Sequence, residues 1–145
     1  MLELEKRETL VLRQLRAALG GLFLFVLLGV LLEAFHAFKW MGYLHVQNET
    51  RRMLLRLAHA HGTVLSLMQL GFALAGKAYP VLLESVRPGA MLLAQVLIPL
   101  GFLLGAIGAV DGDPGPWIAF LPAGALALLV GLGSSVWVLR RGEQS

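Results

Sequence analysis

The chain contains no cysteine, and this absence excludes disulfide scaffolds, cysteine-ligated zinc, iron–sulfur clusters and thiol chemistry. Charged residues are also scarce: they make up 14 % of the 145 positions, whereas hydrophobic residues make up 57 %. Ordinary globular domains are only about 45–50 % apolar. Together with a mean hydropathy of +0.74, this composition predicts an integral membrane protein whose main partner is the lipid bilayer.

The apolar residues fall into four stretches, each about 20 residues long, which is the length that crosses a bilayer. We therefore expect an all-α, four-helix bundle in the membrane, formed by residues 1–145 as a single domain. No separate soluble domain fits beside these spans. The expected spans are residues 17–39, 53–78, 89–110 and 117–139, and residues 1–16 are expected to form an interfacial lead-in helix.

Lysine and arginine residues flank these spans unevenly, and cytoplasmic loops carry the excess of them. Eight lie on the side of the chain termini: Lys6, Arg7, Arg13, Arg16, Lys77, Arg87, Arg140 and Arg141. Four lie on the opposite side: Lys39, Arg51, Arg52 and Arg56. This bias predicts both termini on the cytoplasmic side, in a bacterial inner membrane. Because topology and lipid headgroups account for the positive charge, we expect no nucleic-acid partner.

A polar cluster near the outer end of the first two spans is the main sign of a function. It contains all four histidines and one carboxylate: Glu33, His36, His45, His59 and His61. A carboxylate inside a span costs about 2.5–3.5 kcal/mol, so Glu33 needs a partner. Glu33 and His36 share one helix face. On the next helix His59 shares a face with Arg56, and His61 points about 200° away from it.

If the first two spans pair as an antiparallel hairpin with its midpoint near residue 45, Glu33 lies level with about residue 57. This register predicts one site composed of Glu33, His36, Arg56 and His59. Ser66 and Gln69 would lie deeper as further polar lining. Tyr43, with Trp40, is expected at the water interface.

Two kinds of cofactor suit this site. A divalent metal ion could take Glu33, His36 and His59 as ligands, with His61, Asp111 or Asp113 completing the set. Alternatively, two histidines from neighbouring helices could hold heme b, with Gly29 and Gly62 allowing a porphyrin to come close. Either cofactor would serve electron transfer at the outer face, with Glu33 and Arg56 tuning it.

Residues 56–72, with the sequence Arg-Leu-Ala-His-Ala-His-Gly-Thr-Val-Leu-Ser-Leu-Met-Gln-Leu-Gly-Phe, resemble the heme-ligating second helix of heme-copper oxidases. In that helix a histidine, sometimes followed by glycine, precedes an apolar run. The resemblance implies that His61 is an axial ligand, whereas the helical periodicity favours His59. The later metal-binding histidines of that family are absent from the chain.

Two other interpretations need no cofactor. Glu33 could pair with Arg56, and the histidines could complete a structural network, as buried ion pairs that fix helix register do. The chain would then be an accessory subunit, whose glycine-rich third and fourth spans dock a partner membrane protein or a second copy. A proton conductor with Glu33 as the carrier would require dimerisation.

Overall fold

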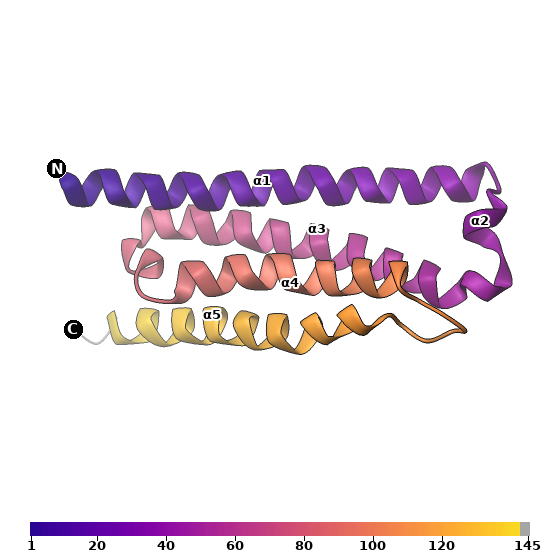
Figure 1. Ribbon diagram of the computed structural model, residues 1–145. Coiled ribbons are helices and arrows are strands. Elements are labelled where there is room, and N and C mark those ends of the chain that lie inside the picture. The colour runs from indigo at the N-terminus through magenta and orange to yellow at the C-terminus, as the bar shows by residue number, and fades with distance from the viewer. Residues whose placement is uncertain (143–145) are drawn as a thin grey trace.

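The computed structural model describes residues 1–142, and it is built from helices (Figure 1). The four long helices are α1 (Leu2–Ala37), α3 (Glu49–Ala78), α4 (Arg87–Ile107) and α5 (Phe120–Gly142). The short helical turns between them are α2 (Met41–Leu44), η1 (Val46–Asn48), η2 (Pro80–Leu83) and η3 (Pro116–Ala119). Over the described residues there is no β-strand, so the all-α prediction is confirmed.

The long helices lie side by side in the order α1, α3, α4, α5 (Figure 1). α3 packs against α1 on one side and α4 on the other, and α5 packs against α4. Within residues 1–142, the backbone of α5 approaches neither α1 nor α3, although Leu128, Val138 and Leu139 of α5 pack against the apolar cluster that includes Phe72 of α3. The backbones of the long helices therefore form an open row, in which α1 also touches α4. The predicted four-helix bundle, with α5 packed back on α1, stays a prediction.

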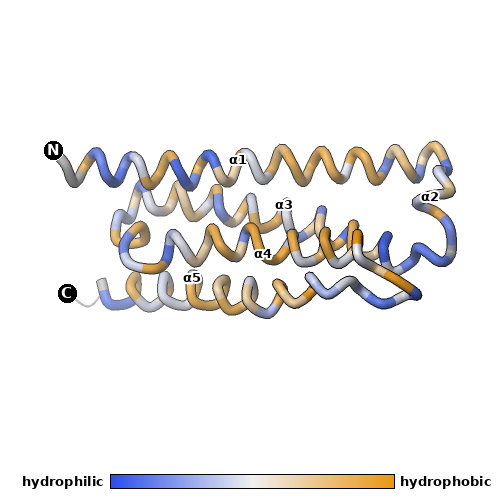
Figure 2. Tube along the Cα trace, viewed as in Figure 1, coloured by the Kyte–Doolittle hydropathy of each residue, from blue (hydrophilic) through white to orange (hydrophobic). Residues whose placement is uncertain are grey.

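Three helical segments are long and apolar enough to span a membrane: Leu4–Ala37, Arg87–Ile107 and Pro116–Arg141. In Figure 2 the hydrophilic residues gather toward the two ends of the row, and its middle is mostly apolar. This pattern supports the predicted membrane environment. α1 runs without a break from Leu2 to Ala37, so the expected lead-in segment and the first span are one helix.

α3 is less apolar than these three segments, and two of its polar residues, Ser66 and Gln69, are buried between the helices. Gln14, Ser66, Gln69 and Gln95 are all buried, and they form a polar layer across the three helices. Gln69 donates a hydrogen bond to Gln14, and Gln95 donates to the Ser66 hydroxyl (3.1 Å) and to the Ala17 carbonyl (2.9 Å). Such interhelical bonds hold membrane helices together, at about 0.6–2 kcal/mol each.

Two arginines at the start of α3 satisfy carbonyl groups at the ends of other helices. Arg51 donates from Nε to the Ala106 carbonyl (3.2 Å) and from Nη2 to the Ala109 carbonyl (3.3 Å), at the end of α4. Arg52 donates to the Leu44 carbonyl (2.7 Å), at the end of α2. Since the last carbonyls of a helix lack intrahelical partners, these cations fasten the loops at this end of the row.

Several glycines of α4 and α5 pack within the chain. A Cβ on Gly124 would lie 2.7 Å from Cγ1 of Ile98, and one on Gly105 would lie 3.1 Å from Cδ1 of Ile118. These faces bring the last two spans together, as small residues do in membranes. Gly89 of α4 and Gly133 of α5 have no atom within 4 Å of their Cβ positions, and docking of these helices on a partner stays a prediction.

Gly62 on α3 allows the Phe25 ring of α1 to lie against the helix backbone. A Cβ there would be 2.2 Å from Cγ of Phe25, at the rigid base of the ring. We expect Gly62→Ala to destabilise the protein by about 1–3 kcal/mol, as overpacking does. Gly71→Ala on the same helix is the control, because no atom lies within 4 Å of its Cβ position. Thermal unfolding in mild detergent would measure both, and equal stability of the two variants would contradict this packing.

Candidate ligand groove

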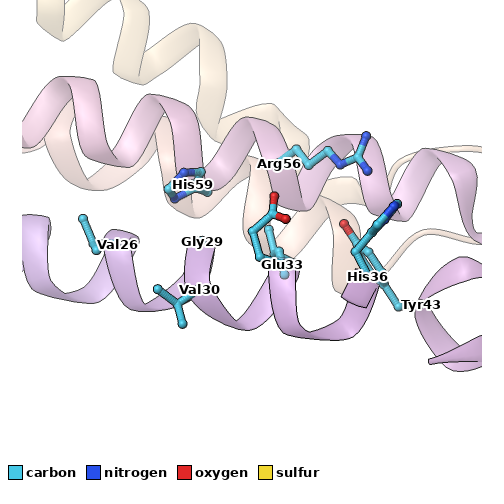
Figure 3. Close-up of a pocket in the computed structure, with 9 residues that line it drawn as sticks. Val26, Gly29, Val30, Glu33, His36, Tyr43, Arg56 and His59 are labelled. Atoms are coloured by element: carbon cyan, nitrogen blue, oxygen red, sulfur yellow. The ribbon is translucent and has the colours of Figure 1, made fainter. Parts of the chain in front are cut away.

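A groove of about 550 Å³ opens between α1 and α3, near the end of the row that carries α2 (Figure 3). Its lining is apolar toward the middle of the row and polar toward its end. We call it the Arg56 groove, and its lining residues are Val26, Gly29, Val30, Leu32, Glu33, His36, Tyr43, Arg56 and His59.

The four residues that the sequence grouped into one site line this groove: Glu33 and His36 from α1, and Arg56 and His59 from α3. Glu33, His36 and Arg56 are exposed, whereas His59 is half-buried. In Figure 3 the Glu33 carboxylate points toward α3, and the Arg56 side chain extends along α3 toward the level of His36. A negative group, a positive group and an imidazole therefore surround one opening.

The predicted register of the hairpin is close to that of the structure. Gly29 lies against the ring of His59. Glu33, one turn further along α1, is therefore level with about residue 55 of the antiparallel α3, within two residues of the predicted position.

His59 joins the groove to the contact between α1 and α3. Its Nδ1 lies 2.6 Å from the carbonyl oxygen of Phe25. Because a carbonyl oxygen can only accept, Nδ1 donates this hydrogen bond, and Nε2 is the ring nitrogen that takes no part in it. The same hydrogen bond to a backbone carbonyl orients many histidines that ligate metals.

The two glycines expected to admit a porphyrin are both covered by side chains of the chain itself. A Cβ on Gly29 would lie 2.4 Å from Cε1 of His59, and Phe25 covers Gly62. The prediction of close porphyrin approach at these glycines is therefore wrong. A planar ligand in the Arg56 groove must lie on its open side.

The other two histidines lie outside the Arg56 groove. The His61 ring packs on Phe102 of α4, with 4.8 Å between ring centroids, and its Nδ1 lies 3.0 Å from the Leu57 carbonyl of its own helix. His45 lies between α2 and η1, exposed to solvent. His59, and not His61, faces α1, as the helical periodicity indicated.

A bare metal site finds little support. Among residues 1–142, no group of three or more His, Asp or Glu side chains is arranged to hold a metal ion. Asp111 and Asp113, considered as additional ligands, lie in the turn between α4 and η3, where Asp113 pairs through its backbone with Val110 (2.9 and 3.1 Å). Neither lines the Arg56 groove.

Tyr43 is the polar lining residue of the groove that the site prediction missed. The sequence suggested the water interface for it, and in the fold only 4 % of its surface is exposed. Tyr43 belongs to the short α2 helix, which closes the end of the groove. Its ring centroid lies 5.9 Å from that of Phe35 in α1. The aromatic pair gives no signal in the helical periodicity, because α2 is only one turn long.

Comparisons with protein-family models, with curated proteins and with solved structures find no match to this chain. The resemblance of residues 56–72 to a heme-ligating helix stays a prediction.

Replacement of His59 by alanine should weaken the contact between α1 and α3. The variant loses the hydrogen bond to Phe25 and leaves a space beside Gly29, so we expect a loss of about 1–2 kcal/mol. His61→Ala is the matched control, and we expect a change within about 0.5 kcal/mol. Thermal unfolding of both variants in mild detergent tests this assignment. A His61 variant that is the less stable of the two would show that the roles are reversed.

Proposed function

We propose that this chain is a small integral membrane protein with four spans that binds heme b in the Arg56 groove and transfers electrons at the outer face of the bilayer. The observation that carries the proposal is the gathering of His36, His59, Arg56 and Glu33 around one groove with an apolar wall. Its volume, about 550 Å³, lies within the range of cofactor sites.

The position of α3 supports it as the fourth membrane-spanning helix. This helix lies between α1 and α4 and alongside both, and these two neighbours are long and apolar enough to cross. A helix with partners on both sides can cross a bilayer with polar residues that face those partners. With four crossings both termini share one side, and the lysine and arginine bias favours the cytoplasmic side of a bacterial inner membrane.

Each part of the groove suits one part of heme b. Val26 and Val30 offer an apolar wall to the macrocycle, and the Arg56 guanidinium suits the propionates. The His36 imidazole, exposed at the opening, is the iron ligand in this proposal. His59 supports the wall while its ring lies on Gly29, and it becomes a second ligand only by turning toward the groove.

An absorption spectrum of the oxidised and dithionite-reduced protein, purified in mild detergent, tests the proposal. We expect a Soret band with sharp reduced bands, lost in His36→Ala and retained in His61→Ala. Thermal unfolding of the His36 variant controls for misfolding, since His36 is exposed and its removal should leave stability within about 0.5 kcal/mol. A purified protein without a Soret band when heme is supplied would overturn the proposal.

A second candidate function is that of an accessory subunit in a larger membrane complex. The observation that favours it is the open row, in which the backbone of α5 lies along α4 and does not approach α1 or α3. Here the Glu33, Arg56 and histidine cluster would be purely structural.

The accessory role predicts co-purification. If it holds, the chain should purify from a mild-detergent extract together with a stoichiometric membrane-protein partner or as a defined homo-oligomer. Size-exclusion chromatography with mass spectrometry measures this. A colourless monomer would contradict both candidate functions, whereas a monomer that carries heme would favour the first.

A further inference from the structure

A second groove lies between α1 and α3, at the end of the row near the chain termini. Its volume is about 480 Å³, and it is formed by the first turns of α1, the last turns of α3 and η2. We call it the Arg7 groove. Its charged lining residues are Arg7, Glu8 and Lys77, and none of its lining residues belongs to the Arg56 groove.

Two cations from different helices face this groove. Arg7 comes from α1 and Lys77 from the last turn of α3, and both are exposed. Glu8 is the one carboxylate in the lining, so the charged groups of the groove sum to one positive charge. Basic pockets between membrane helices attract phosphate-bearing lipid headgroups, at about 1 kcal/mol per cation.

Most of the apolar lining lies below these cations on both helices, whereas Leu4 and Pro80 lie at the outer end of the groove. On α1, Leu12 and Leu15 follow Arg7, and Leu15 lies about 12 Å further toward the middle of the row. On the antiparallel α3, Leu74 precedes Lys77 and so also lies toward the middle. Leu12 and Leu74 are 50 % and 55 % exposed, so the chain itself leaves this apolar surface open.

We propose that the Arg7 groove binds an anionic phospholipid from the leaflet on the side of the termini. The phosphate would lie between Arg7 and Lys77, and one acyl chain would follow Leu12, Leu15 and Leu74. Glu8 suits a headgroup with hydroxyl donors, such as the glycerol of phosphatidylglycerol. A cationic top above an apolar lower part matches the order of charge and hydrocarbon in such a lipid.

Lipid titration of the purified, delipidated full chain, followed by native mass spectrometry in mild detergent, tests this site. The probes are phosphatidylglycerol and phosphatidylcholine with the same acyl chains. We expect a clear preference for phosphatidylglycerol, reduced about five-fold by Arg7→Gln or Lys77→Gln and about 25-fold by both together.

The control is the double variant Lys6→Gln with Arg13→Gln, which removes the same charge from α1 outside the groove lining. It should retain the preference for phosphatidylglycerol. Equal losses in the two double variants would mean attraction to overall charge, and they would overturn the site. Equal binding of the two lipids by the unaltered chain would also overturn it.

A third probe separates a lipid from a free phosphate compound. Glycerol 3-phosphate carries the phosphate without acyl chains, so it should not displace bound phosphatidylglycerol at a hundred-fold excess. Leu74→Ser should weaken lipid binding while thermal unfolding shows that the chain stays folded. Displacement by glycerol 3-phosphate would show a site for the headgroup alone and would overturn the acyl groove.

Discussion

The close contact between α1 and α3 is the constraint on which the rest of the structure depends. Apolar helices gain no hydrophobic free energy by meeting in lipid, so their association needs close packing and polar contacts. Here each helix offers a glycine to an aromatic ring of the other: Gly29 lies against His59, and Gly62 against Phe25. This reciprocal fit fixes the axial register, and the register decides which polar residues meet at the Arg56 groove.

The position of α3 between two neighbours explains its composition. Ser66 and Gln69 would be costly on a lipid-facing helix, but both are enclosed and bonded through α1 or α4. Gln95 of α4 reaches across to the α1 carbonyl of Ala17, so one polar layer connects three helices. Between α4 and α5 the close contact is made by small residues instead, such as Gly124 and Gly131 of α5.

Helical periodicity predicted much of the α1–α3 contact before any coordinates. The separation of His59 from His61 around the helix follows from 100° per residue, and the level of Glu33 follows from the rise per residue. The partner of each glycine could not be predicted, because a glycine marks a space without indicating what fills it. Gly29 suggested room for a porphyrin, whereas the space belongs to the His59 ring. The open row could not be predicted for a related reason: the sequence of α5 does not indicate which other helices it packs against.

The two grooves lie at opposite ends of the same helix pair, and the glycine contacts lie between them. Long charged side chains belong at the ends, where they reach water, and small residues belong in the middle, where backbones approach. His59 stands at the boundary, since its ring packs on Gly29 and also lines the Arg56 groove. A ligand that contacts Glu33 on α1 and Arg56 on α3 would join the same two helices. Such a ligand binds only when α1 and α3 are paired, as the His59 contact already favours. It must therefore stabilise the folded chain by mass action.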